Sequence, residues 1–171
     1  MRQEHGRRAA RGPLYTADQR RRRDASRWTL VQGVLAPLQF LVFLVSTALV
    51  WRFLSTGDGA LLATVSIVVK TLLLYTIMIT GSLWERDVFG KYLFAPAFFW
   101  EDVVSFLVMA LHTAYLVAAF GGFLDLRQQM YLALVAYAAY VINAAQFVYK
   151  LRLARLDARA TAPRAPQVAG L

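Results

Sequence analysis

The 171-residue sequence contains no cysteine and only two histidines. Without cysteine the chain can form no disulfide, no thiolate nucleophile and no cysteine-ligated iron–sulfur cluster. One histidine, His5, lies in a polar tail, so the two do not supply the ligand set of a zinc site. The phosphate-binding loops and nucleophile elbows of soluble enzymes are also missing from the sequence. The commonest catalytic centres of soluble proteins are therefore excluded.

Charged residues are scarce and hydrophobic residues are abundant. The charged share is 17%, the hydrophobic share is 58%, and the mean hydropathy is +0.46. This composition is too apolar for a soluble domain and is typical of a small membrane protein. The formal net charge is +9, and most of the arginines lie in the two tails. We attribute this excess to membrane orientation and anionic lipid rather than to nucleic-acid binding.

Four long apolar segments predict an all-α integral membrane protein, a four-transmembrane-helix bundle. Each segment has about 20 residues or more, enough to cross a hydrocarbon core of about 30 Å. Lysine and arginine concentrate in both tails and in the middle loop, which places both termini in the cytoplasm. The expected spans cover about residues 28–53, 60–84, 102–124 and 129–150.

The domain organisation predicted from the charge pattern has three parts. We expect a basic N-terminal tail over residues 1–27, a transmembrane domain over 28–150, and a basic, frayed C-terminal tail over 151–171. The segment Thr16-Ala17-Asp18-Gln19 has the form of a capping box, which predicts a short basic helix on the lipid headgroups. A charge cluster that only sets the membrane orientation is the alternative.

The stretch from Tyr92 to Leu116 holds the densest set of candidate functional residues. At about 100° per residue, Glu101 and Ser105 each fall about 20° from His112. The three residues therefore predict a polar stripe on an apolar helix, roughly 16 Å long. The aromatic run that precedes the stripe is expected to lie at the membrane interface as a belt or a shallow re-entrant turn.

Polar residues in the middle of the other spans are also candidates. Lys70 lies near the centre of the second span, and Asn143 and Gln146 share a face of the fourth. An ionisable residue inside a membrane is a functional candidate by default. The structural alternatives are a hydrogen bond that satisfies Lys70 and amides that join two helices.

The stripe itself allows several interpretations. His112 is a packed histidine, a ligand to the metal of a bound pigment, or an acid–base group. The adjacent Glu101 and Asp102 are either a solvated helix start paired with Lys91 or a catalytic pair. Burial beside a like charge would keep one carboxyl protonated near neutral pH, as a general acid requires.

Three long strings of the sequence are distinctive: LYTADQRRRRDASRWTLVQGVLAPLQF, KYLFAPAFFWEDVVSFLVMALHTAYL and YVINAAQFVYKLRLARL. They resemble the 3-vinyl bacteriochlorophyllide hydratase family of phototrophic bacteria, and with the spans between them the resemblance extends over about Leu14 to Leu156. It implies a lyase of bacteriochlorophyll synthesis that hydrates the vinyl group on ring A of a chlorophyllide-type Mg-tetrapyrrole to a 1-hydroxyethyl group, without a redox cofactor.

The polar residues suggest roles in such a reaction. We expect Glu101 or Asp102 to protonate the vinyl CH2 and the other carboxylate to hold and deprotonate the water. We expect His112 to ligate the substrate's Mg, and Lys91 or Arg86 to pair with its free propionate. The expected aromatic slot consists of Phe98, Phe99, Trp100 and Tyr115, and further substrate contacts are expected from Ser105, Lys70, Asn143 and Gln146.

The expected partners are the Mg-tetrapyrrole, the lipid of the bacterial inner or intracytoplasmic photosynthetic membrane, and neighbouring pathway enzymes. We expect no cofactor and no nucleic acid. Two other functional classes stay open: a non-catalytic pigment-binding or photosystem assembly protein, and a small transporter built around Lys70, Glu101 and Asp102. Turnover of a vinyl pigment separates a hydratase from a binding protein.

Overall fold

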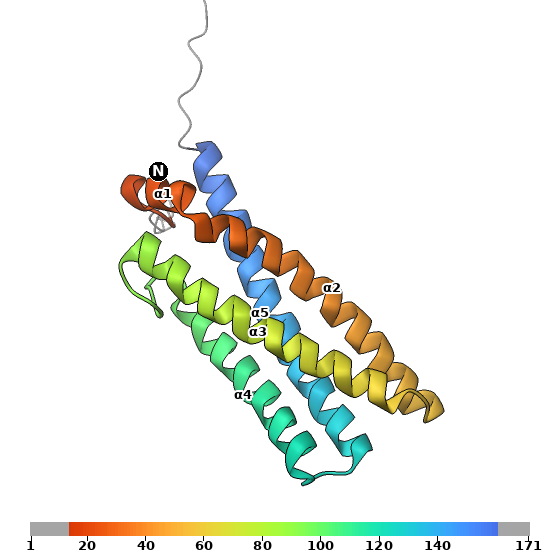
Figure 1. Ribbon diagram of the computed structural model, residues 1–171. Helices are drawn as coiled ribbons and strands as arrows, with labels where there is room; N and C mark the ends of the chain where they lie inside the picture. Colours follow the sequence, from red (N-terminus) through yellow and green to blue (C-terminus); the bar gives the residue numbers. More distant parts are fainter. Residues whose placement is uncertain (1–13, 161–171) are drawn as a thin grey trace, which may run out of the picture.

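The computed structural model describes residues 14–160, and over this range the chain forms five α-helices (Figure 1). Four of them are long and apolar enough to cross a membrane. The prediction of an all-helical protein with four such segments is confirmed. The outer parts of both predicted tails, 1–13 and 161–171, lie outside the described residues. The helices are α1 (Ala17–Ala25), α2 (Arg27–Thr56), α3 (Ala60–Phe89), α4 (Phe99–Gly121) and α5 (Leu126–Ala160).

Helices α2, α3 and α5 are longer than the apolar spans expected from the sequence, whereas α4 has 23 residues, the expected length, and begins and ends three residues earlier than expected. Glycines in the left-handed region end three of them: Gly57 with φ 82° after α2, Gly90 with φ 77° after α3 and Gly122 with φ 68° after α4. The difference arises because the hydropathy of the sequence falls at the first charged residue, whereas the helix itself continues to the glycine at its C-cap. As a result α3 carries Glu85 inside its last turns, and α5 continues ten residues past the expected end of its span at 150.

The bundle consists of two antiparallel hairpins, α2 with α3 and α4 with α5 (Figure 1). In the first hairpin Gln32 donates to Thr80 Oγ1 (2.7 Å), and Ser46 bonds to Ser66 (2.7 Å). In the second, Asn143 Nδ2 donates to Ser105 Oγ at 2.7 Å. The two hairpins touch each other less along α3 and α4 than the helices do within each hairpin.

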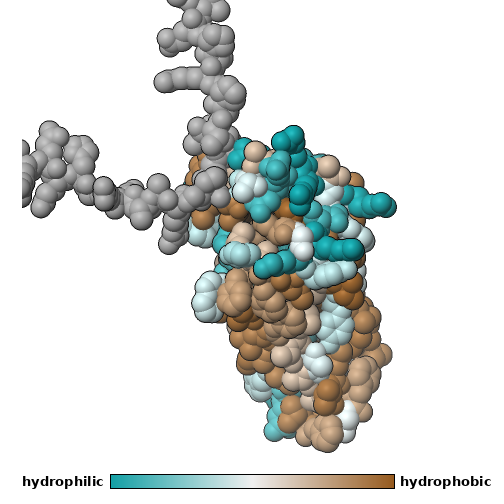
Figure 2. All heavy atoms as spheres, turned by 90° about the vertical axis from the view of Figure 1, so that its left-hand side faces the viewer, coloured by the Kyte–Doolittle hydropathy of each residue, from teal (hydrophilic) through white to brown (hydrophobic). Residues whose placement is uncertain are grey.

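Apolar side chains cover most of the outside of the bundle. Figure 2 shows hydrophilic residues gathered at one end of the molecule and hydrophobic residues over most of the rest of that face. The hydrophilic end, here called the α1 end, carries α1, the connection between α3 and α4, and the last turns of α5 (Figure 1). This division is typical of helices whose sides face lipid.

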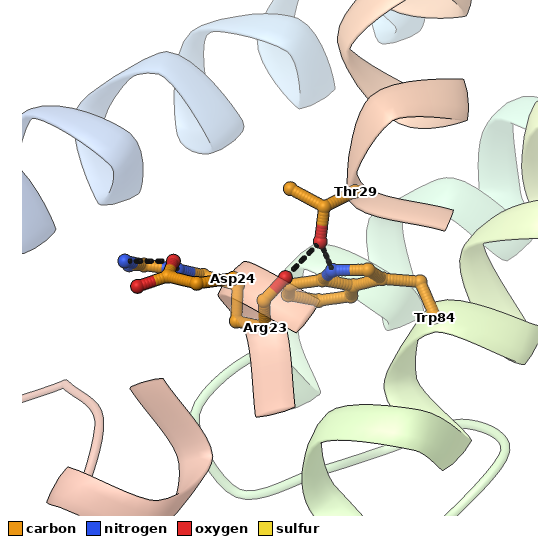
Figure 3. A network of polar contacts seen from close by, with 4 residues as sticks. All are labelled: Arg23, Asp24, Thr29 and Trp84. Atoms are coloured by element: carbon orange, nitrogen blue, oxygen red, sulfur yellow. Dashed lines mark hydrogen bonds and ion pairs between the residues drawn. The ribbon is translucent and has the colours of Figure 1, made fainter. Parts of the chain in front are cut away.

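Helix α1 is fixed across the α1 end by hydrogen bonds. The capping box predicted at Thr16 is present, with Gln19 N donating to Thr16 Oγ1 at 3.2 Å and Thr16 N to Gln19 Oε1 at 2.9 Å. Thr29 Oγ1 donates to the carbonyl of Arg23 (2.6 Å) and accepts from Trp84 Nε1 (3.0 Å), as Figure 3 shows. These bonds hold the α1–α2 corner against α3, directly beside Glu85.

Candidate functional site

Two buried carboxyl groups meet at the α1 end of the bundle. Glu85 on α3 is 5% exposed and Asp102 on α4 is 4% exposed. Their side chains lie close enough for one carboxyl, when protonated, to donate a hydrogen bond to the other. Because a carboxylate oxygen only accepts, such a bond requires a proton on one of the two groups. We call these two residues the carboxyl pair.

The carboxyl pair also binds the backbone of the α3–α4 connection. Asp102 Oδ2 accepts from Phe94 N at 2.7 Å, and Glu85 Oε2 accepts from Ala95 N at 3.1 Å. Phe94 has φ 58°, a left-handed conformation that a bulky residue rarely adopts. The two acceptors therefore hold a strained segment in place and set the position of the Phe94 ring.

Glu101 faces a different helix from its neighbour Asp102. Its Oε2 lies 3.4 Å from Lys150 Nζ of α5, and Lys150 also donates to the carbonyl of Ala97. Adjacent helical residues point about 100° apart, so the two acids of the sequence pattern cannot share one partner. Glu101 and Asp102 therefore do not form the expected pair: Asp102 pairs with Glu85, and Glu101 pairs with Lys150. The positively charged partner is Lys150, whereas Lys91 is exposed.

Sequence reasoning missed Glu85 and Lys150 as site residues, although the helical period could have identified both. Glu85 lies eleven residues beyond the buried Leu74, about 20° away on the same face of α3. Lys150 lies seven residues beyond the buried Asn143, also about 20° away. If the helical spacing of buried residues is continued past the last apolar residue of each span, both side chains are predicted to lie inside the bundle.

An aromatic cluster lies beside the carboxyl pair at the α1 end. It consists of Tyr15, Trp84, Phe89 and Phe98, with the Phe98 ring 5.5 Å from Trp84 and the Tyr15 ring 5.9 Å from Phe89. Burial raises the pKa of the Tyr15 phenol, against the opposing effect of the Arg23 guanidinium. The cluster is apolar and well packed, so it separates the carboxyl pair from the solvent beyond α1.

The four residues expected as one aromatic slot do not come together. Phe98 is buried in the aromatic cluster, and Tyr115 is buried deep in the bundle core. Phe99 and Trp100 are exposed on the outside of the bundle. The slot was inferred from nearness in sequence, whereas consecutive helical residues point in different directions.

An apolar groove opens between α3 and α4 on the side of the bundle. Its volume is about 310 Å³, at the lower end of the range for small-molecule sites, which suits one edge of a flat ligand. The lining residues on α3 include Met78 and Ser82, and those on α4 include Phe106 and Met109.

Both walls of the groove lead to the carboxyl pair. Glu85 follows Met78 and Ser82 at helical spacings of seven and three residues, and Asp102 precedes Phe106 and Met109 by four and seven. Residues at these spacings share a helix face. The Phe94 ring stacks on Phe106 with centroids 5.5 Å apart, at the end of the groove nearest the carboxyl pair.

The remaining predicted residues lie in the bundle interior or on its surface. Glu101, Ser105 and His112 share one face of α4, and this face contacts α5 rather than the groove. Lys70 is fully buried, with Nζ 3.6 Å from the ring centroid of Tyr140, and no hydrogen bond joins it to Asn143 or Gln146. Arg86 is exposed, 5.0 Å from the Tyr92 ring centroid. Among residues 14–160, no three His, Cys, Asp or Glu side chains form a metal-ligand group.

Comparisons with known proteins identify the family. A family model described as 2-vinyl bacteriochlorophyllide hydratase matches residues 15–153. The chain belongs to this family. It is 67% identical over 147 residues to the 2-vinyl bacteriochlorophyllide hydratase of Cereibacter sphaeroides, covering 86% of this chain and 91% of that protein. It is 66% identical over 149 residues to the protein of the same name from Rhodobacter capsulatus, covering 87% and 86%.

Membership of this hydratase family confirms the resemblance stated from the sequence, and it makes the chain a hydro-lyase of bacteriochlorophyll synthesis. The pigment-binding and transporter alternatives gain no support. The matched residues 15–153 include the carboxyl pair, the Glu101–Lys150 ion pair and the groove. No solved structure matches the chain.

The ion pair generates a stability prediction. Lys150→Met removes the cation and leaves the Glu101 carboxylate buried without its counter-charge. We expect a loss of about 1–3 kcal/mol in the free energy of unfolding, less than for a fully buried pair because the Lys150 side chain is 24% exposed. Thermal unfolding of the purified protein in detergent measures it.

The double variant Glu101→Gln/Lys150→Met is the control for this prediction. It removes both charges and should recover most of the lost stability, because no unpaired charge is left. Equal destabilisation in the single and double variants would show that Lys150 stabilises through its packing rather than its charge.

Proposed function

We propose that the protein adds water across the vinyl group of a bacteriochlorophyllide-type Mg-tetrapyrrole to give a 1-hydroxyethyl group, with the carboxyl pair as acid and base. The names of the relatives support the reaction. The observation that carries the assignment of residues is the position of Glu85 and Asp102, two neighbouring buried carboxyls on the helix faces that also line an apolar groove.

The carboxyl pair supplies both proton transfers of the hydration. The protonated member donates its proton to the terminal CH2, and the resulting cation is spread into the macrocycle. Water then forms a bond from its oxygen to the inner vinyl carbon and loses a proton to the ionised member. The pair ends with one proton, as it began, so no external acid or base is consumed.

The surroundings of the carboxyl pair favour this chemistry. One negative charge on the pair lies next to the position where the cation develops, and it stabilises that cation. The aromatic cluster and the groove exclude bulk water, so the interaction acts at low dielectric. A second ionised carboxylate nearby, Glu101, is neutralised by Lys150.

The groove fits one edge of the macrocycle, with the ring lying against Phe106 and Met109 and its vinyl group at the carboxyl pair. Arg86 lies one turn beyond Ser82 of the groove wall and is exposed. Its guanidinium is therefore the best-placed partner for the substrate's propionate, which prefers the headgroup level. His112 lies on the face of α4 that contacts α5, so in this pose it does not ligate the substrate's Mg.

The distribution of positive charge supports a cytoplasmic location of the α1 end in the bacterial inner or intracytoplasmic photosynthetic membrane. Four arginines of the N-terminal segment, Arg20 to Arg23, lie at this end, as do Arg152 and Arg155 of α5. The opposite end holds only Arg52 and Arg127. Contact between the α1 end and neighbouring pathway enzymes stays a prediction.

The orientation can be tested by cysteine labelling, because the native chain has no cysteine. Lys91→Cys and Asp58→Cys place one thiol at each end, both at exposed positions. In spheroplasts, a membrane-impermeant maleimide should label Asp58→Cys and leave Lys91→Cys unlabelled until the membrane is opened. The opposite pattern would place the α1 end outside the cytoplasm.

The carboxyl pair is tested by amide variants. In Glu85→Gln the amide can still accept from Ala95 N and donate to Asp102, so the fold is retained while proton transfer is lost. We expect kcat for hydration of a vinyl chlorophyllide to fall about 10²–10⁴-fold in Glu85→Gln and in Asp102→Asn. Product mass and the blue shift on loss of vinyl conjugation measure turnover.

Glu101→Gln is the matched control for this experiment, because it changes a neighbouring carboxyl that lies outside the carboxyl pair. We expect it to lose far less activity than Glu85→Gln. Full loss in Glu101→Gln with activity kept in Glu85→Gln would transfer the acid role to Glu101 and refute the proposed mechanism.

The groove is tested by filling it. Met109→Trp adds bulk to its wall and should raise the Kd for chlorophyllide at least about tenfold, whereas Phe120→Trp, at a lipid-facing position 78% exposed, should leave it unchanged. Binding is followed by pigment fluorescence. Unchanged affinity in Met109→Trp together with lost affinity in His112→Ala would refute the groove pose and support ligation by His112.

A further inference from the structure

The two members of the carboxyl pair lie at helix ends of opposite polarity. Asp102 lies in the first turn of α4, which begins at Phe99. Glu85 lies in the last two turns of α3, which ends at Phe89. The dipole of a helix stabilises a negative charge near the N-terminus and disfavours one near the C-terminus. Both helix ends therefore favour the ionised form at Asp102 and the protonated form at Glu85.

The backbone donors of the α3–α4 connection distinguish the two carboxyls in the same way. Phe94 N lies 2.7 Å from Asp102 Oδ2, whereas Ala95 N lies 3.1 Å from Glu85 Oε2. Hydrogen bonds to an ionised acceptor are shorter than bonds to a neutral one, about 2.7–2.9 Å, and roughly twice as strong. The short contact at Asp102 is typical of a carboxylate, and the longer contact at Glu85 is typical of a neutral carboxyl.

The left-handed backbone of Phe94 belongs to the turn that directs these donors. The N–H groups of the consecutive residues Phe94 and Ala95 both point at the carboxyl pair. Successive N–H groups that point to the same side of a turn form a concavity that binds an anion. A bulky residue at φ 58° is strained, and such strain persists where the surrounding contacts hold it in place. The turn therefore matches a pair that carries one negative charge.

The charge that opposes this distribution is the carboxylate of Glu101, the residue before Asp102. A like charge nearby favours the protonated form of a carboxyl. Lys150 Nζ lies 3.4 Å from Glu101 Oε2 and offsets that charge. The ion pairs among residues 14–160 give Glu85 no cation of its own, and a buried carboxyl without a counter-charge stays neutral.

We propose that Glu85 is the acid and Asp102 the base of the hydration, and that Phe94 is the positioning residue that fixes these roles through its backbone N–H. The assignment rests on the proposed function. The Glu85 O–H bond breaks as its proton passes to the terminal vinyl CH2, which becomes CH3. The oxygen of water then bonds to the inner carbon while the Asp102 carboxylate takes a proton from that water. Transfer of this proton from Asp102 to Glu85 restores the starting state.

The position of the proton is tested by infrared spectroscopy of the full-length protein in membranes at neutral pH. A protonated carboxyl has a C=O stretching band that a carboxylate lacks. We expect this band to shift when the side-chain carboxyls of glutamate carry carbon-13, to be absent from Glu85→Gln, and to remain in Glu101→Gln. A band that shifts with labelled aspartate and is absent from Asp102→Asn, or no such band in the wild-type protein, would overturn the assignment.

The two roles are tested by deuterium incorporation from D2O into bound vinyl chlorophyllide. Asp102→Asn keeps the acid and lacks the base, so Glu85 should deuterate the vinyl CH2 reversibly. The recovered substrate should then carry deuterium on its terminal carbon while little alcohol forms. Glu85→Gln should show neither exchange nor hydration, and pigment fluorescence checks that both variants bind the substrate. Exchange in Glu85→Gln and none in Asp102→Asn would reverse the roles.

The role of Phe94 is tested at its backbone. Phenyllactic acid incorporated at position 94 replaces the N–H by an ester oxygen and keeps the ring. We expect kcat to fall about tenfold with KM unchanged, and the infrared band to respond to aspartate labelling, because the ionised form of Asp102 loses its donor. Lactic acid at position 95 removes the donor to Glu85 and is the matched control, which should keep the band on glutamate and most of the activity. Equal losses in both esters would show a structural connection and refute the positioning role.

These experiments separate the assignment of roles from the proposed function. If Glu85→Gln and Asp102→Asn both keep wild-type hydration, the carboxyl-pair mechanism is wrong whichever residue holds the proton. If both variants lose hydration while the infrared band belongs to Asp102, the carboxyl-pair mechanism stands and the assignment of acid and base is wrong.

Discussion

The architecture depends on one constraint, which is that a polar group inside a membrane must find its partner within the protein. The buried neighbours Glu85 and Asp102 meet this constraint together, because one carboxyl can donate its proton to the other. The ion pair of Glu101 with Lys150 meets it with a counter-charge. The strained α3–α4 connection meets it by donating its free N–H groups to the same acids. The contacts that satisfy these buried polar groups are therefore the same contacts that form the candidate site.

Much of the fold could be predicted from the sequence, because long apolar runs and helix-ending glycines determine the position of each helix through nearby residues alone. The four spans, the capping box at Thr16 and the stripe from Glu101 to His112 all follow from period and composition. The composition of the site could not be read in the same way. Glu85 and Lys150 lie past the points where hydropathy falls, and only the facing helices show that they turn inward.

Helix α4 separates an apolar environment from a polar one. Its face with Asp102, Phe106 and Met109 borders an apolar groove, and its face with Glu101 and His112 borders the polar interior. Two residues adjacent in sequence thus belong to opposite sides of the helix.

The weak contact between the two hairpins has a mechanical consequence. Each hairpin contributes one carboxyl, Glu85 from the first and Asp102 from the second. The short connection with Gly90 and Phe94 links the two hairpins and could act as a hinge between them. Moving the two hairpins apart would widen the groove for a rigid macrocycle and separate the two carboxyls. Closing them would bring the pair together again, so one motion would both grip the ligand and assemble the catalyst.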